Sequence, residues 1–163
     1  MPQKGIVPHM VVIAHNIRSA HNVGSILRTA DAVGVEKIYL CGITPTPHDK
    51  FGRARPDIHK AALGAEFFVP WEYKKSVTRV IAKAKKEGYS MVALEQSPHS
   101  IKYTKIKETK NKKVALILGT ETTGLPKTIL KKADCIIEIP MRGKKESLNV
   151  AVAFGIAAFS ITK

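Results

Sequence analysis

The chain of 163 residues contains only two cysteines, Cys41 and Cys135, and no long apolar run. Two separate cysteines without a CxxC pair or a nearby histidine cluster argue against a disulfide framework and against a structural zinc site. No apolar run reaches the roughly 20 residues that span a bilayer, and the N-terminus lacks the apolar core of a signal peptide. We therefore expect a cytoplasmic protein with reduced, buried thiols, no membrane segment and no bound metal.

Aromatic and acidic residues are also scarce. Aromatic residues make up 6% of the chain, which weakens the case for a platform on which single-stranded nucleic acid stacks. The 13 Asp and Glu residues face 27 Lys and Arg residues, so the formal charge is +14. A strongly basic small domain attracts polyanions, most commonly nucleic acid. A well-solvated, Lys-rich surface is the alternative explanation of this charge.

Strand and helix patterns alternate along the chain. Apolar runs of strand length occur at 10–14, 38–41, 66–69, 90–94, 114–118 and 135–139. Helical spacing of apolar residues occurs at 19–33, 73–86 and 147–161, with shorter helical segments near 59–63 and 126–132. The polar connection at 97–113 has room for one short edge strand. This alternation predicts one α/β domain over 1–163, with a mostly parallel sheet and helices on both faces.

Ligands of such sheets bind at the carboxyl ends of the strands, which here directs attention to the loops after Ala14, Leu94, Leu118 and Ile139. The first block is HNIRSAHNVGSILRTADAVG at 15–34. Asn22 is a favoured N-cap residue, and Arg28 lies in a helix of otherwise small and apolar residues. Gly24 suggests a close approach of another backbone, because glycine weakens a helix by about 1 kcal/mol relative to alanine. An ordinary capped helix with a surface arginine is the alternative.

The second block, VALILGTETTGLP at 114–126, is a buried strand that ends at Gly119 and continues through Glu121 and Gly124. Gly119 allows a sharp turn with no side chain in the way, which suits contact with a flat ligand. The block lacks the GK[ST] of a phosphate-binding P-loop and the GxGxxG of a dinucleotide-binding enzyme such as a dehydrogenase. A plain turn after a strand is the alternative.

The third block, IPMRGKKESLNVAVAFGIAAF at 139–159, combines a basic loop with a helix for which Ser147 is the expected cap. That helix is apolar on nearly every face and must therefore be buried on every face, for example between its own sheet and a second subunit. Asn149 is a polar amide in the expected first turn. A buried amide needs hydrogen-bond partners, so Asn149 is expected to serve a site or an interface.

Together the three blocks resemble the SpoU/TrmH family of RNA ribose methyltransferases within the SPOUT superfamily. The resemblance rests on Asn22-x5-Arg28, on Gly119-x-Glu121-x-x-Gly124-Leu125, and on IPM-x-G-x-x-x-SLNV from Ile139 to Val150. It implies a SPOUT-like sheet whose C-terminal part forms a trefoil knot that binds S-adenosylmethionine. It also implies a homodimer packed through the first and last helices.

The resemblance further implies roles for individual residues. The cofactor pocket would include Leu94, Gly119, Ile139, Met141 and Leu148. The catalytic, polar part of the site would include Asn22, Arg28, Glu121, Ser147 and Asn149, with the arginine of one subunit near the methyl group held by the other. The family assigns activation of the hydroxyl to this arginine. A guanidinium is rarely a proton acceptor, so we expect Arg28 to stabilise the developing alkoxide instead.

The resulting hypothesis is S-adenosylmethionine-dependent methylation of a ribose 2'-hydroxyl in transfer or ribosomal RNA. Candidate RNA-binding side chains are Arg53, Arg55, Arg142 and Lys144. Two alternatives remain open at this point: a non-catalytic RNA-binding protein with the same fold, and a methyltransferase that acts on an RNA base. Ala151, Thr120 and Thr122 depart from the residues more usual in the family.

Overall fold

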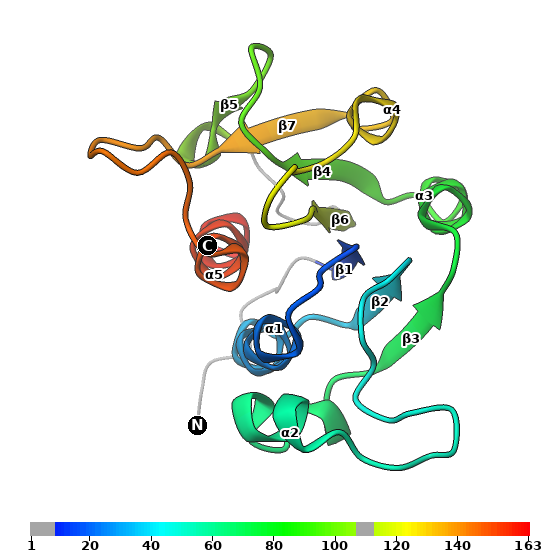
Figure 1. Ribbon diagram of the computed structural model, residues 1–163. Coiled ribbons are helices and arrows are strands. Elements are labelled where there is room, and N and C mark those ends of the chain that lie inside the picture. The colour runs from blue at the N-terminus through cyan, green and yellow to red at the C-terminus, as the bar shows by residue number, and fades with distance from the viewer. Residues whose placement is uncertain (1–8, 107–112) are drawn as a thin grey trace.

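The computed structural model describes residues 9–106 and 113–163, and its centre is a parallel sheet. Seven strands pair in the order β3-β2-β1-β6-β4-β7-β5, and every pairing is parallel (Figure 1). The strands are β1 (Met10–His15), β2 (Lys37–Cys41), β3 (Trp71–Lys74), β4 (Ser90–Leu94), β5 (Ile101–Lys102), β6 (Val114–Leu118) and β7 (Cys135–Glu138). The predicted α/β class with a parallel sheet is therefore confirmed.

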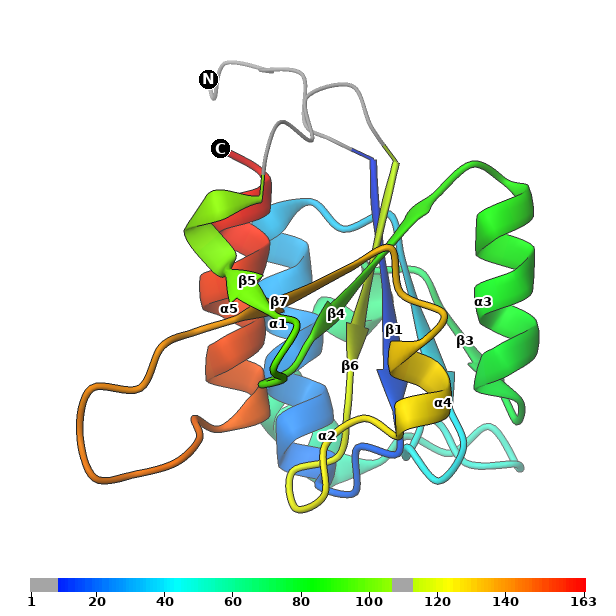
Figure 2. The ribbon, with the colours of Figure 1, turned by 90° about the horizontal axis from the view of Figure 1, so that it is seen from above.

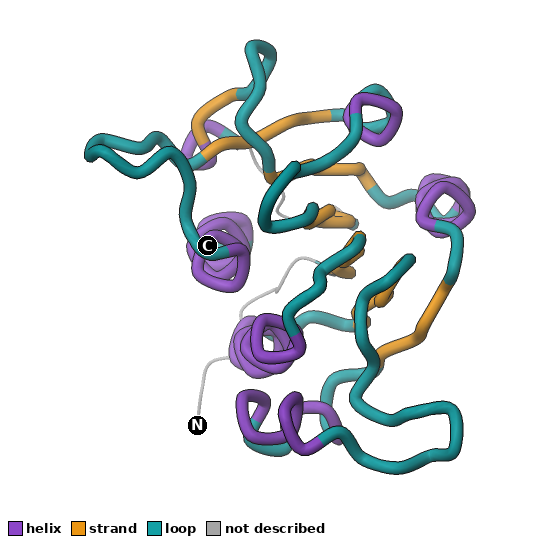
Figure 3. Tube along the Cα trace, in the orientation of Figure 1, coloured by secondary structure: helices purple, strands orange, loops and turns teal. Residues whose placement is uncertain are grey.

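Helices cover both faces of this sheet, as predicted. They are α1 (Ala20–Val33), α2 (Pro56–Ala62), α3 (Val77–Lys86), α4 (Lys127–Leu130) and α5 (Val150–Ile161). Figures 1 and 3 show α1, α2 and α5 on one face and α3 and α4 on the other. Across the described residues, no helix has the length and apolar character needed to cross a membrane.

The alternation of side chains along a strand explains why two cores form. In β1, Met10, Val12 and Ala14 pack in the core on the side of α1 and α5. Val11 and Ile13 point to the opposite face and pack in the core on the side of α3. Successive strand residues face opposite sides of a sheet, so a central parallel strand must be apolar throughout. This requirement accounts for the uninterrupted apolar runs of the sequence.

The first helix is bounded as its sequence indicates. Ser19 caps α1 by accepting a hydrogen bond from the Asn22 backbone N–H, so Asn22 lies inside the helix and is not its cap. Gly34 ends the helix with a φ of 83°, in the left-handed region that glycine tolerates. A Cβ on Gly24 would lie 2.6 Å from both the Ala61 Cβ and the Ile58 carbonyl oxygen. Gly24 therefore permits close packing of α1 against α2, as its position suggested.

The prediction of a strand at 66–69 is wrong. Residues Ala65–Phe67 form a 3₁₀ turn that follows Gly64, whose φ is 89°. The strand comes later, as β3, because Trp71 pairs with Ile38 at the start of β2. The next helix consequently begins at Val77, after the cap Ser76, and not at residue 73.

The start of the last helix also differs from the prediction. Asn149, and not Ser147, is the N-cap of α5, and its side-chain oxygen accepts from the backbone N–H groups of Ala151 and Val152. Asn149 is therefore exposed at the helix end, whereas the sequence pattern had suggested a buried amide. Ser147 lies in the preceding loop. At the far edge of the sheet, β5 is the short edge strand expected within 97–113, of which residues 107–112 lie outside the described residues.

Candidate functional site

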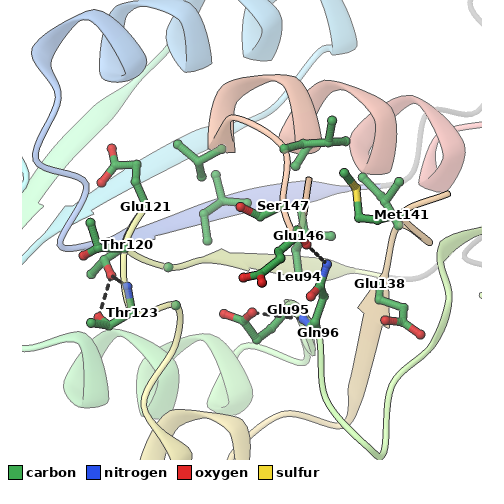
Figure 4. Close-up of a pocket in the computed structure, with 18 residues that line it drawn as sticks. Leu94, Glu95, Gln96, Thr120, Glu121, Thr123, Glu138, Met141, Glu146 and Ser147 are labelled. Atoms are coloured by element: carbon green, nitrogen blue, oxygen red, sulfur yellow. Dashed lines mark hydrogen bonds between the residues drawn. The ribbon is translucent and has the colours of Figure 1, made fainter. Parts of the chain in front are cut away.

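A pocket lies at the carboxyl ends of the central strands, where parallel sheets bind ligands. Its walls come from the segments that follow β4, β6 and β7 and from the first turn of α5, which contributes Val150 and Ala153. The volume of the pocket is about 290 Å³. Figure 4 shows side chains from all three segments gathered around one space. The three central loops singled out in the sequence thus meet at one place.

All five residues predicted to contact a cofactor line this pocket: Leu94, Gly119, Ile139, Met141 and Leu148. Gly119 is buried at the end of β6, whereas the side chain of Leu148 is 38% exposed. The set thus combines a buried backbone position with an accessible apolar side chain. Their binding of a cofactor stays a prediction.

The loop after β6 turns tightly because Gly119 has no side chain. A Cβ at this position would lie 2.8 Å from the Leu125 backbone nitrogen and 2.9 Å from the Gly124 carbonyl carbon. Thr120 and Gly124 form an isolated antiparallel bridge that closes the turn. The Thr120 hydroxyl also accepts a hydrogen bond from the Thr123 backbone N–H at 3.1 Å. One pocket wall is therefore a compact loop with little room to adjust.

Glu95, which the sequence reasoning missed, holds this loop to the end of β4. Its Oε2 accepts a hydrogen bond from the Leu125 backbone N–H at 2.8 Å, and its Oε1 accepts one from the Gln96 backbone N–H at 2.9 Å. The Gln96 side-chain amide donates to the Glu146 carbonyl oxygen at 2.7 Å, which ties in the loop after β7. A polar residue directly after a buried strand was the available signal, because Leu94 was already placed at a ligand-binding strand end.

The pocket wall is acidic in a chain of high positive charge. Four of the 13 acidic residues line it: Glu95, Glu121, Glu138 and Glu146. Figure 4 shows them distributed around the space. Carboxylates in a concave site create a local negative potential that favours a cationic ligand. The pocket therefore differs in character from the basic surface of the rest of the chain.

Asn22, Glu121 and Asn149 form one hydrogen-bonded row beside the pocket. The Asn22 Nδ2 donates to Glu121 Oε1 at 3.0 Å, across 99 positions of sequence. The Asn149 Nδ2 donates to Asn22 Oδ1 at 3.0 Å, across 127 positions. Asn22 is only 7% exposed, so both ends of its amide are satisfied within the protein. The three blocks of sequence therefore meet in a single polar network.

Two of the five predicted polar residues, Arg28 and Ser147, lie outside this network. Arg28 is exposed on α1, in a separate depression that also contains His21, Lys60 and Phe159. Ser147, by contrast, lines the main pocket next to Leu148. Within one chain, then, the predicted catalytic set is divided between the pocket and the outer side of α1.

The four predicted RNA-binding side chains lie in two separate places. Arg53 and Arg55 belong to the segment after β2, where their guanidinium groups pair with Asp49 at 2.7 Å and with Asp57 at 2.8 Å. Arg142 and Lys144 are exposed in the loop after β7, beside the pocket. Figures 1 and 2 show these two segments on opposite sides of the molecule. A single chain does not bring them together.

Neither cysteine is activated as a nucleophile, and the described residues contain no group of side chains arranged to hold a metal ion. Both cysteines are free; burial raises the pKa of the Cys41 thiol to about 12 and also raises that of Cys135. A thiol of raised pKa carries little nucleophilic thiolate at neutral pH. Among residues 9–106 and 113–163, no group of three or more His, Cys, Asp or Glu side chains is arranged to hold a metal ion.

Comparison with known protein families identifies the family of this chain. The model of the SpoU rRNA Methylase family matches residues 9–159, which include all three blocks and both sides of the pocket. The chain belongs to this family. The resemblance inferred from the three blocks is therefore confirmed.

Curated relatives of this SpoU-family chain include two RNA methyltransferases. The 23S rRNA (guanosine-2'-O-)-methyltransferase RlmB of Coxiella burnetii is 30% identical over 161 residues, or 99% of this chain and 61% of the relative. The tRNA (guanosine(18)-2'-O)-methyltransferase of Escherichia coli K12 is 30% identical over 152 residues, or 93% of this chain and 62% of the relative. The chain thus spans about three fifths of the length of these relatives.

Solved structures share the fold of this SpoU-family chain. An AdoMet-bound rRNA methyltransferase from Sinorhizobium meliloti superposes with a TM-score of 0.85 and 31% identity, over 95% of this chain and 56% of the other. A structure described in terms of the 2-OH methylation of C/U34 on tRNA superposes with a TM-score of 0.76 and 25% identity, over 94% of this chain and 95% of the other. The second comparison covers nearly all of both chains.

Proposed function

We propose that this protein transfers a methyl group from S-adenosylmethionine to a ribose 2'-hydroxyl of transfer or ribosomal RNA. The observation that carries the proposal is the Asn22–Glu121–Asn149 network, because it joins the three family blocks beside a pocket of cofactor size. Family membership and the relatives named as 2'-O-methyltransferases support the same reaction. The net charge of +14 suits a polyanionic substrate.

The pocket residues fit S-adenosylmethionine by their chemistry. The cofactor carries a sulfonium and an ammonium cation, and four glutamates line the pocket. Leu94, Met141 and Leu148 provide apolar surface for a flat base, and Gly119, which has no side chain, lines the pocket with backbone atoms only. The AdoMet-bound structure of the rRNA methyltransferase from Sinorhizobium meliloti supports this assignment.

The bound cofactor would supply an electrophilic methyl group, and the protein would supply position and charge. Asn22 and Asn149 would hold the substrate side of the pocket in one geometry through their shared hydrogen bond. Glu121 accepts from Asn22 and would orient that amide, which makes it a positioning residue. Arg28 would stabilise the negative charge that develops on the attacking oxygen.

This role of Arg28 requires a second subunit, since Arg28 lies away from the pocket of its own chain. We propose a homodimer packed through α1 and α5. Its support is the exposed apolar surface of α5, where Val152 is 52% exposed and Phe159 is 53% exposed. Phe159 also borders the depression that contains Arg28. Packing of a second copy there would cover both features.

Three further assignments complete the proposal. The pocket loops after β4, β6 and β7 would be threaded as a trefoil knot; the hydrogen bonds of Glu95 and Gln96, which join these loops, support such a compact crossing. Residues 1–163 would act as one methyltransferase domain. The cytoplasm would be its location, because both cysteines are free.

The test begins with calorimetric titration of the protein with S-adenosylmethionine. Methyl transfer to unmodified transfer and ribosomal RNA is then followed by nuclease digestion and mass spectrometry of the nucleosides. The proposal expects saturable cofactor binding and a product methylated on ribose. A product methylated on a base would contradict the ribose assignment, and RNA binding without cofactor binding would support a non-catalytic protein.

Arg28→Lys tests the role of the arginine. Lysine keeps a cation but deprotonates near pH 10, whereas arginine stays charged, so the variant should lower kcat and change the alkaline limb of the pH–rate profile. An unchanged profile would contradict the role proposed for Arg28. Mixing Arg28→Ala protein with Asn149→Ala protein should restore part of the activity if each site uses residues of two subunits.

A further inference from the structure

Half of the aromatic residues of this chain are concentrated in one short stretch. Five of the ten Phe, Trp and Tyr residues lie within 51–73, between the loop after β2 and strand β3. Three of them are large exposed surfaces: Phe51 is 70% exposed, Phe67 is 63% exposed and Phe68 is 75% exposed. Large exposed apolar side chains that lie together often mark an interaction site, whereas single ones do not.

Four rings of residues 48–71, two of them histidines, form a continuous array. His48 stacks on Trp71 with a centroid distance of 6.0 Å and an angle of 15° between the planes. Phe67 contacts His48 and His59 edge-on, each at 6.1 Å. We call Trp71, His48, Phe67 and His59 the ring array. Such chained contacts preorganise the rings, which reduces the entropy lost when a ligand binds.

A buried carboxylate, that of Glu66, pairs with one ring of the array. Glu66 has a side chain that is 3% exposed, and its Oε1 pairs with His59 Nδ1. This contact fixes His59 against the edge of Phe67. The backbone on the other side is fixed by the bridge between His48 and Ala54 and by the hydrogen bond from the Arg55 N–H to the Pro47 carbonyl. The rings are therefore held by the fold and do not depend on a flexible loop.

Cations accompany Phe51, in the loop that also carries His48. The Lys50 Nζ lies 5.1 Å and the Arg53 Cζ lies 5.0 Å from the centre of the Phe51 ring. Lys50 forms no ion pair among the described residues, so its charge remains for a ligand. Aromatic faces beside cations are the combination that binds unpaired nucleotides, since bases stack and phosphates pair with the charges.

The loop that carries His48 and Phe51 begins at the carboxyl ends of the strands, where the pocket also lies. Every strand is parallel, so the segment after β2 and the segment after β6 both start at these carboxyl ends. Figure 2 shows the loop after β2 and the loop after β6 on the same edge of the molecule. The ring array thus extends from this loop, which begins on the pocket side of the sheet, to the amino end of β3, where Trp71 pairs with Ile38.

We propose that the ring array, together with Phe51 and Phe68, is a stacking surface for unpaired nucleotides of the RNA substrate. This inference rests on the proposed function and adds that part of the substrate is single-stranded. A second copy of the chain is a poorer occupant. A two-fold contact through this surface would bring Lys50 of one copy toward the same cation of the other.

The only tryptophan, Trp71, reports on this surface directly. A single-stranded RNA of about 10 nucleotides, within the range bound by stacking domains, is titrated while Trp71 fluorescence is recorded. The expected result is saturable quenching, with weaker binding to a duplex of the same sequence. Phe51→Ala and Phe67→Ala should each weaken the affinity at least about fivefold, as stacking contributions predict.

Ile101→Ala is the matched control, because Ile101 is 39% exposed on β5 at the opposite edge of the sheet. It should leave the RNA affinity within about twofold of wild type, as expected for a surface change away from the site. Circular dichroism confirms that each variant is folded. Unaltered Trp71 fluorescence at saturating RNA, or phenylalanine variants that bind like wild type, would overturn the proposal. A loss of dimer mass in the phenylalanine variants would instead identify a contact between copies, which also overturns it.

Separate measurements distinguish a failure of the stacking surface from a failure of the proposed methyltransferase activity. Cofactor binding is measured by calorimetry at a pocket that none of the ring residues lines. Methyl transfer that persists unchanged in the phenylalanine variants would refute the stacking surface alone. Absence of cofactor binding would refute the methyltransferase, while the fluorescence titration would still report whether the rings bind RNA.

Discussion

Gly119→Ala is the substitution that tests the pocket most directly. The added Cβ would lie 2.7 Å from Leu125 Cγ, 2.8 Å from the Leu125 nitrogen and 2.9 Å from the Gly124 carbonyl carbon. Two of these neighbours are backbone atoms, so a side-chain rotation cannot relieve the contact. The Leu125 N–H is also held by Glu95 at 2.8 Å. The loop must therefore move as a unit, which displaces one wall of the pocket.

The expected cost has two parts. Forcing a methyl group into a closely packed loop destabilises a protein by about 1–3 kcal/mol. Displacement of the wall should in addition raise the Kd for S-adenosylmethionine at least about tenfold, which corresponds to about 1.4 kcal/mol. Urea denaturation gives the first quantity, and calorimetric titration of the folded variant gives the second. Both are measured at one temperature and one salt concentration.

Gly143→Ala supplies the matched control in the neighbouring pocket loop. A Cβ on Gly143 would have no heavy atom within 4 Å, so this variant should be close to wild type in both assays. If Gly119→Ala binds the cofactor as tightly as Gly143→Ala does, the loop after β6 does not form the binding wall. The reasoning from backbone contacts would then be refuted, whatever the activity of the variant.

Other variants test the network, the edge of the sheet and the buried thiol. Asn22→Asp removes the amide donor to Glu121 and sets two carboxylates together, so urea denaturation should show a loss of about 1–3 kcal/mol; a stability equal to wild type would contradict the network. Hydrogen bonds from Lys37 and Lys74 lower the pKa of Glu72 to about 2. The ionised Glu72 therefore contributes to stability above pH 4.5, and this contribution is lost as the pH falls toward 2. Glu72→Gln should flatten thermal stability over that range, and an unchanged slope would refute the assignment. Cys41, whose pKa is raised to about 12, should react slowly with a thiol reagent at pH 8 until urea unfolds the chain.

The strands were predictable because burial on both faces leaves a simple signature. β4 and β6 have the bounds expected from their apolar runs. Where the signature is weaker, tertiary pairing decided the outcome. Trp71 lies between the strand predicted at 66–69 and the helix predicted from residue 73, but its pairing with Ile38 makes it the first residue of β3. No local property of residues 66–74 contains that information.

The position of Arg28 shows a limit of a different kind. Asn22 and Arg28 are six positions apart, which is about 1.7 turns of an α-helix, so the two side chains leave the helix in different directions. The motif spacing therefore does not say whether both side chains serve the same pocket. In the structure, Asn22 bonds to Glu121 while Arg28 lies in a separate depression. A motif can identify the members of a site without saying how many chains build it.

The aromatic residues illustrate why composition is a weak guide to binding. At 6% of the chain, aromatic residues gave little reason to expect a stacking surface. That percentage is an average, whereas stacking depends on a few rings at one place. Folding brings Trp71 of β3, Phe67 of the 3₁₀ turn and His48 of the preceding loop into contact within 6.1 Å. Because histidine is not counted as aromatic in the composition, half of the ring array is absent from the very number that argued against it.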